Sequence, residues 1–163
     1  MTLVDLPTSD EMAATDFKTA FRRYATGVAV ITAVTPDGPV GLTASSVASV
    51  SAEPTVVSFS VATAGRSATA LLGTERMSVH LLASDQADVA RAFATSGAPR
   101  FTAVQGWDGD RLPGALATLD GVVRSRVPLG EATLVVLEIE TTTLGSGVSP
   151  MVHHDRTYWS LVR

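Results

Sequence analysis

The stretch Gly41-Leu-Thr-Ala-Ser-Ser-Val-Ala-Ser-Val-Ser51 is the most informative segment of this 163-residue chain. Most of its positions are small or hydroxylated, which weakens a strand unless something approaches the backbone closely. Hydroxyl groups and exposed main-chain N–H groups together suit an anionic phosphate or the polar edge of a planar ring. The same composition also fits a Ser- and Thr-rich turn at the end of a strand, and composition alone leaves both interpretations open.

Apolar, β-branched runs lie on both sides of this segment, and turn residues separate them. Only short helices are indicated between the runs, which fits an antiparallel barrel better than a sheet built from β-α-β units. A segment rich in Gly, Pro and Asp over 97–114 predicts a long excursion without regular structure. We expect strands at 28–35, 40–47, 55–61, 77–82, 116–127, 132–144 and 157–162, and helices at 65–72 and 84–94.

The N-terminal region is polar and acidic, and we expect a flexible leader over 1–15 and a single domain over 16–163. Asp16 is a candidate cap for a short helix in which Phe17, Phe21 and Tyr24 share one apolar face. The leader lacks the apolar segment of a signal peptide, and no apolar run approaches the roughly 20 residues of a membrane span. We therefore expect a cytoplasmic protein without a membrane partner.

Composition restricts the classes of function. There is no cysteine, which excludes disulfide scaffolds, iron–sulfur clusters and cysteine nucleophiles. The net charge of −4 argues against nucleic acid as a partner, because phosphate neutralisation needs clustered Lys and Arg. The three histidines are His80, His153 and His154, and the adjacent pair would point to opposite faces of a strand, so we expect no metal site.

Two features predict self-association. Charged residues make up only 17% of the chain, so a folded domain would carry few surface charges. The run Leu134-Val135-Val136-Leu137 is apolar at successive positions, which predicts a strand covered on both faces, one of them by a second subunit.

Two further segments are candidates for ligand binding. Arg66-Ser67 lies at the expected start of the 65–72 helix, where free N–H groups and a fixed charge suit phosphate, although this segment taken alone favours an ordinary helix cap with a solvated arginine. The C-terminal cluster around His154 and Tyr158 could hold a planar ring or form only a polar hairpin. The dinucleotide fingerprint G-x-G-x-x-G and the hydrolase elbow G-x-S-x-G are both absent.

Taken in order, these segments resemble the flavin reductase family, the FMN-binding split barrels that include reductase components of two-component monooxygenases. The resemblance runs from about Phe21 to Leu161, and the quoted stretch, continued through Pro54, is its most specific part. Further matching segments lie at 24–32, 77–82, 86–93, 112–117 and 150–158.

The resemblance implies a mainly β fold, an antiparallel Greek-key split β-barrel with a few short helices. It also implies a homodimer with the flavin near the subunit interface. The implied activity is NAD(P)H-dependent reduction of FMN, or of FAD, by hydride transfer from NADH or NADPH, with the reduced flavin passed to a partner monooxygenase. The implied flavin-binding residues are Thr26, Gly27, Val28, Thr43, Ala44, Ser45, Ser46, Ser60, Val61, Ala62, Arg66, Ser67, His154 and Tyr158, with His154 also the catalytic candidate on the nicotinamide side.

Three positions depart from the family pattern. Ala132 stands where many members have a histidine near the flavin, His80 replaces a common asparagine, and Val47 replaces an aromatic residue. The first departure affects the nicotinamide end of the implied site most.

Flavin chemistry needs no acid or base side chain, because the protein mainly stacks two rings and stabilises charge on the flavin. A chain without cysteine or an obvious catalytic dyad can therefore be an enzyme of this kind. Two alternatives remain at this point: a split-barrel flavoprotein with tightly bound FMN that acts by itself, and a non-catalytic module that binds flavin or haem.

Overall fold

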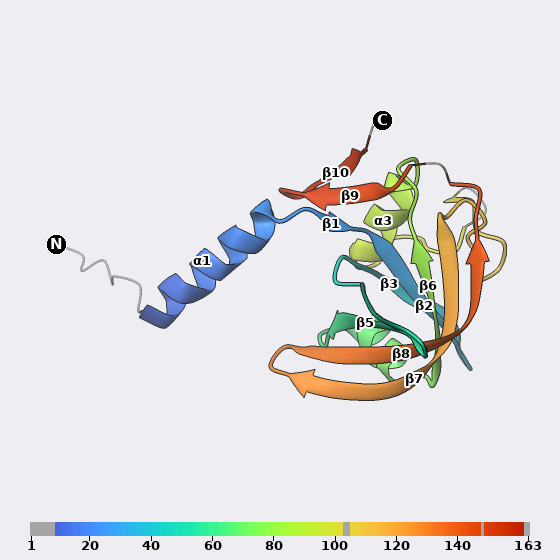
Figure 1. Ribbon diagram of the computed structural model, residues 1–163, viewed down its shortest axis with the longest axis horizontal. Coiled ribbons are helices and arrows are strands. Elements are labelled where there is room, and N and C mark those ends of the chain that lie inside the picture. The colour runs from blue at the N-terminus through green and yellow to red at the C-terminus, as the bar shows by residue number, and fades with distance from the viewer. Residues whose placement is uncertain (1–8, 103–104, 148, 162–163) are drawn as a thin grey trace.

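Antiparallel strands dominate the computed structural model, which describes residues 9–102, 105–147 and 149–161 (Figure 1). A seven-stranded sheet has the order β3-β2-β6-β7-β8-β5-β4, and a three-stranded sheet has the order β1-β9-β10. The large sheet consists of β2 (Ala29–Thr35), β3 (Gly38–Ala44), β4 (Ala48–Ala52), β5 (Thr55–Ala62), β6 (Arg76–Leu81), β7 (Ala117–Leu129) and β8 (Ala132–Leu144). The small sheet consists of β1 (Thr26–Gly27), β9 (Met151–His154) and β10 (Thr157–Ser160).

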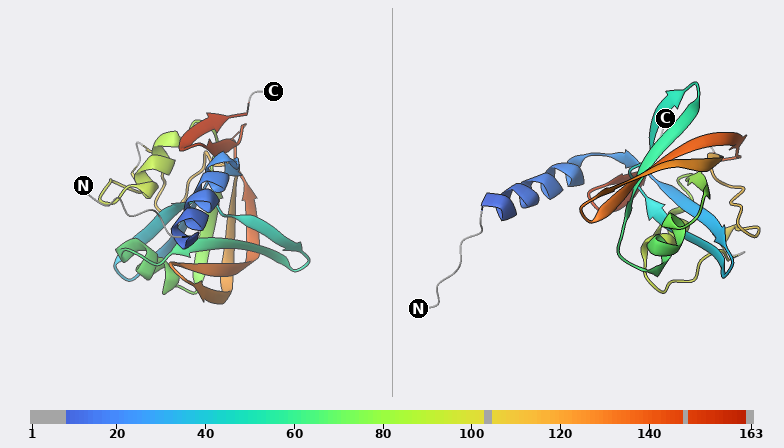
Figure 2. Two further views of the ribbon diagram at one scale, coloured as in Figure 1. Left: turned by 90° about the vertical axis from the view of Figure 1, so that its left-hand side faces the viewer. Right: turned by 90° about the horizontal axis from the view of Figure 1, so that it is seen from below.

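Three helices accompany the sheets: α1 (Ser9–Arg23), α2 (Arg66–Leu72) and α3 (Ala87–Ala94). Figure 2 shows the sheet curled strongly around its own axis, with α2 and α3 against the body and α1 extending away from it. Within the described residues, no helix is both long and apolar enough to cross a membrane. The expected mainly β class with short helices is thus confirmed.

Four elements differ from the sequence-based expectations. The first helix begins at Ser9 and not at the expected cap Asp16, because Ala13 and Ala14 are strong helix formers that extend it toward the N-terminus. Strands β1, β4 and β9 are not among the expected strands. All three are short, and β4 is mostly exposed, so none shows the alternation of buried and exposed residues by which a strand is found.

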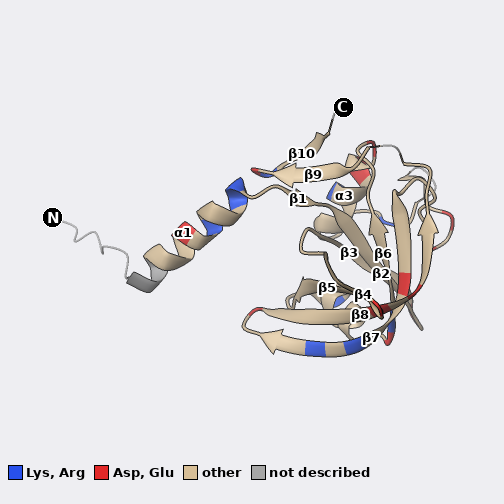
Figure 3. Ribbon diagram, viewed as in Figure 1, with Lys and Arg blue, Asp and Glu red and all other residues tan. Residues whose placement is uncertain are grey.

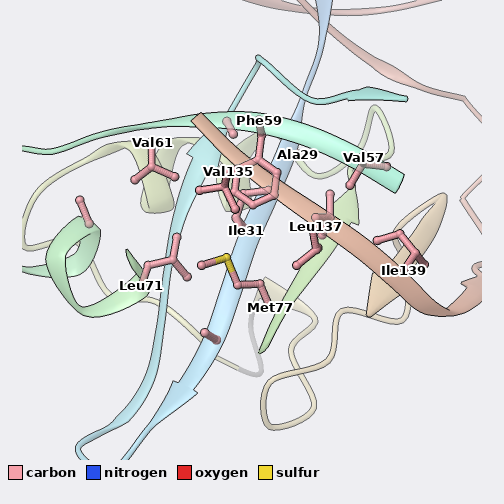
Figure 4. Packing of buried hydrophobic residues seen from close by; sticks show 14 residues of the cluster. Ala29, Ile31, Val57, Phe59, Val61, Leu71, Met77, Val135, Leu137 and Ile139 are labelled. Atoms are coloured by element: carbon pink, nitrogen blue, oxygen red, sulfur yellow. The ribbon is translucent and has the colours of Figure 1, made fainter. Parts of the chain in front are cut away.

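The first hydrophobic cluster fills the inside of the curled sheet (Figure 4). Side chains alternate along β8, so that Val135 and Leu137 are buried inside while Leu134 and Val136 lie half-buried on the outer face. The inner partners come from every side of the sheet and from α2: Ile31, Phe59, Val61, Leu71, Met77 and Val79. Within one chain, the expected apolar run is therefore covered on one face only.

A second cluster lies on the opposite face of β2. Val30 points away from the barrel interior and packs with Leu82, α3 and the excursion after α3. Phe93 and Phe101 are 4.9 Å apart between ring centroids, and Trp107 lies 5.3 Å from Phe93. The expected excursion is therefore held to the barrel by aromatic packing.

The large sheet does not close completely. Strand β3 contacts β5, but the two are not hydrogen-bonded partners. One edge of β3 consequently keeps main-chain N–H and C=O groups outside the strand ladder. This split in the barrel positions the site described below.

His80 is a buried polar group of β6, only 1% exposed. Its Nε2 and Nδ1 lie 3.0 Å from the hydroxyls of Thr32 and Thr118, and Trp107 packs edge-on at 5.1 Å. Burial lowers the pKa of His80 to about 4; Asp120 and Asp110 oppose this shift, and Arg111 adds to it. The imidazole is thus neutral at neutral pH and serves as one donor and one acceptor.

We expect His80 to make stability depend on pH. The unfolded chain takes up a proton near pH 6.5 and the folded chain only near pH 4, so the free energy of unfolding should fall as pH decreases through that interval. The full loss should be about 3 kcal/mol. Urea unfolding at several pH values measures it, and His80→Asn should remove this slope whereas the control His153→Asn should keep it. An unchanged slope in His80→Asn would contradict the assignment.

Candidate functional site

A groove of about 1,080 Å³ lies at the split of the barrel, between β3, the end of β5, α2, α3 and the excursion. Eight of the fourteen residues expected at a flavin line this groove, although they come from three separate stretches of the chain. They are Thr43, Ala44, Ser45, Ser46, Ser60, Ala62, Arg66 and Ser67. The structure therefore brings the hydroxyl-rich stretch and the start of α2 together.

The floor of the groove depends on Gly41 in β3. A Cβ atom at this position would lie 2.8 Å from the carbonyl oxygen of Ile31 and 2.8 Å from Cε1 of Phe93. Only glycine lets the α3 side chain Phe93 lie directly on the strand. Thr43 supports the same contact, because its hydroxyl donates to the carbonyl of Ala90 in α3 at 2.6 Å.

Ser46 and Ser60 connect the two sides of the split. The main-chain N–H of Ser60 donates to the Ser46 hydroxyl at 2.9 Å, and that hydroxyl donates to the Ser60 carbonyl at 3.3 Å. The hydroxyl group of Ser46 thus replaces a missing strand-to-strand hydrogen bond. Both residues line the groove, so this pair of hydrogen bonds joins two parts of its wall.

Arg100, in the excursion, is a groove residue that the sequence did not indicate. Its guanidinium donates to the carbonyl of Gly41 and to the hydroxyl of Ser67, both at 2.9 Å. It also donates to the carbonyls of Ala92 and Thr95 at the end of α3, at 3.3 and 3.0 Å. Arg100 therefore joins β3, α2 and α3 through one rigid side chain.

The groove is positively charged. Arg66 and Arg100 are the charged residues among those that line it, and no carboxylate lines it. The hydrogen bonds of Arg100 all go to neutral carbonyl and hydroxyl oxygens, so its charge is not neutralised by an ion pair. In a chain of net charge −4, this arrangement selects an anionic ligand.

Four expected residues lie in the small sheet and not in the groove lining. Thr26 pairs with His153, and Tyr158 pairs with the same His153 from the other side. Gly27 pairs with Val152, and His154 pairs with Thr157. The ring of Tyr158 lies beneath the Arg91 guanidinium of α3, 5.7 Å away, and burial raises the pKa of Tyr158 above its ordinary value.

Helix α3 connects the two groups of residues. Tyr158 packs against the second hydrophobic cluster, which contains Phe93, and Phe93 also lines the groove. The last two expected residues, Val28 and Val61, are buried and point into the two clusters, so only their main chains are available to a ligand. Phe93, Phe101 and Arg100 are groove residues that the sequence did not indicate; each stands alone in its segment without a recognisable motif.

Comparison with known proteins identifies this architecture. The sequence model of the flavin reductase like domain matches residues 21–161. An NADH:FMN oxidoreductase of Rhodococcus erythropolis is 34% identical over 160 residues, which cover 93% of this chain and 83% of that protein. The reductase component of 4-hydroxyphenylacetate 3-monooxygenase of Thermus thermophilus is 32% identical over 146 residues, 90% of this chain and 95% of that protein.

A solved structure agrees with these sequence matches. The crystal structure of a flavin reductase domain protein from Arthrobacter sp. FB24 superposes with a TM-score of 0.80 at 32% identity, covering 92% of this chain and 96% of that one. The range matched by the family model, 21–161, includes both the barrel and the segments that form the groove. The chain belongs to the flavin reductase-like domain family.

Proposed function

We propose that this protein is an NADH:FMN oxidoreductase that supplies reduced flavin to a monooxygenase component. The observation that carries the proposal is the groove at the barrel split, which has two arginines, no carboxylate and a free strand edge. The similar proteins named above support it, since one is an NADH:FMN oxidoreductase and another a monooxygenase reductase component.

The residues of the groove fit the two parts of FMN. Arg66, Arg100 and Ser67 would bind the phosphate, because fixed positive charge and a hydroxyl suit a dianion. The free N–H and C=O groups at the edge of β3, around Thr43 and Ser45, would meet the polar edge of the ring system. FAD would place its first phosphate at the same arginines.

The protein contributes binding and orientation. When bound, the flavin supplies the redox chemistry, accepting a hydride from the nicotinamide. The Ser46–Ser60 bridge and the Gly41–Phe93 contact keep the groove in one shape, so binding requires little rearrangement. Such preorganisation of two reactants is a sufficient source of rate for a transfer that needs no acid or base.

The small sheet is the proposed nicotinamide side. His154 lies in β9 and Tyr158 in β10, and Tyr158 packs against the cluster that contains Phe93 of the groove. Burial raises the pKa of Tyr158, so its phenol stays protonated and available as a donor. We assign His154 to binding of the dinucleotide amide or phosphate.

We also propose a homodimer. The outer face of β5 and β8 carries Leu134 and Val136, which are half-buried in the single chain. Leu134 pairs with Ser60 and Ala62 pairs with Ala132, so this face continues directly into the rim of the groove. A second copy seated there would cover the apolar face and add a wall to the flavin site.

The activity is tested by mixing the protein with FMN and NADH and following the nicotinamide absorbance. We expect continuous NADH oxidation that depends on both the protein and FMN. The same mixture without FMN is the control. If FMN binds but NADH oxidation does not exceed the rate without protein, the chain is a flavin-binding module and the proposal is wrong.

Arg66→Ala should weaken the binding of FMN by about 10- to 100-fold, since a charge-assisted contact contributes about 1.5–3 kcal/mol. The binding of riboflavin should weaken by less than about twofold, because riboflavin has no phosphate. Fluorescence titration with each flavin measures both affinities. Arg124→Ala, which removes a surface arginine paired with Glu138, is the matched control. Equal weakening of the two flavins by Arg66→Ala would place Arg66 away from the phosphate.

His154→Ala should raise the KM for NADH by about fivefold, the value of one hydrogen bond, and leave FMN affinity within about twofold. Steady-state kinetics and a flavin titration separate the two effects. The control is Arg124→Ala, which removes a surface arginine of β7 in the other sheet. A loss of flavin binding in His154→Ala would assign this residue to the flavin, and no change in either quantity would remove it from the site.

A further inference from the structure

Helix α1 forms an arm that leaves the body of the molecule (Figures 1 and 2). Neither hydrophobic cluster includes a residue of this helix. A main-chain hydrogen bond joins the end of the helix to the small sheet, in which the N–H of Asp155 donates to the carbonyl of Arg22 at 3.0 Å. Basic residues lie in its last turn, beside the small sheet (Figure 3).

One face of the arm is aromatic and exposed. Phe17, Phe21 and Tyr24 are 63%, 59% and 64% exposed. Their rings contact one another, with centroids 4.7 Å apart for Phe17–Phe21 and 6.2 Å for Phe21–Tyr24. Helical spacing places Met12 and Lys18 away from this aromatic face. The arm is thus amphipathic, and the described part of the chain leaves its apolar side exposed.

A matching apolar surface lies on the end of the β7–β8 hairpin. In the strand register Val127 is opposite Leu134, and Leu129 is opposite Ala132, so the four side chains share one face. Val127 and Leu129 are exposed, and Leu134 is half-buried. We call this surface the hairpin face; the hairpin extends to the same side of the molecule as α1 (Figure 1).

The partner that covers the aromatic face of α1 must stay bound permanently. An isolated helix of this length is marginal in water, and most helical stability comes from packing of the apolar face. A monooxygenase that binds transiently would leave the arm unsupported for most of the time. A second copy of the chain is present at fixed stoichiometry, and a two-fold axis lets each arm use the surface that the other copy leaves open.

We propose that α1 is an exchanged arm: in each protomer Phe17, Phe21 and Tyr24 pack against the hairpin face of the second copy. This inference rests on the homodimer proposed above and adds the element that holds the two copies together. The two apolar surfaces, each open in one chain, cover each other in the pair. Because the hairpin face continues into the rim of the groove through Ala132, the arm lies next to the flavin site of its partner.

The arm is tested with the double variant Phe17→Ser/Phe21→Ser. Four buried phenyl rings are lost per dimer, so the dissociation constant measured by analytical ultracentrifugation should rise at least about 100-fold. The control Met12→Ser/Lys18→Ser lowers helix propensity at least as much, away from the aromatic face, and should change the constant by less than about threefold. An unchanged constant in the aromatic variant would overturn the inference.

Hydrogen exchange separates the arm from the dimer itself. In the wild-type dimer, the amides of 13–23 should be protected well beyond a free peptide, and the aromatic variant should lose this protection. If the protein is a dimer but the amides of α1 exchange as fast as those of a free peptide, the exchanged-arm proposal is wrong and the homodimer proposal stands. A wild-type monomer at micromolar concentration would overturn both, while NADH oxidation with FMN reports on the enzyme independently of either result.

Discussion

The close approach of α3 to β3 at Gly41 is the contact on which the rest of the site depends. Phe93 occupies the volume that a side chain at this position would fill, and Arg100, whose guanidinium lies 5.6 Å from the centre of the Phe93 ring, donates to the Gly41 carbonyl. The excursion after α3 is thereby fixed to the barrel, and α2 is fixed to both through Ser67. Because Gly41 has no side chain, β3, α2, α3 and the excursion can pack closely enough to enclose one groove.

The two hydrophobic clusters stabilise different parts of the molecule. The inner cluster fills the inside of the curled sheet and packs its strands against α2. The outer cluster, built around Phe93 and Trp107, attaches helix and excursion to the other face of β2. The groove is therefore bounded by strands of the open barrel on one side and by α3 and the irregular excursion on the other.

The sequence predicted most strands and the mainly β class, because apolar β-branched runs between turns are a strong local signal. It also indicated the hydroxyl-rich wall of the groove and Arg66. It did not indicate Arg100 or Phe101, because their role depends on where an irregular segment folds back, and no local pattern encodes that. Strand β9 was missed for a related reason: it is four residues long and becomes a strand only by pairing with β1 and β10.

The position of Trp107 gives the molecule an internal optical probe. The indole is buried between His80, Phe93 and Phe101, whereas the second tryptophan, Trp159, is on the surface. Trp107 should therefore have its fluorescence emission maximum at a shorter wavelength than Trp159. Because Phe93 and Phe101 also line the groove, Trp107 is separated from it by a single layer of rings. An oxidised flavin absorbs where indole emits, so energy transfer to a flavin in the groove would quench the blue component.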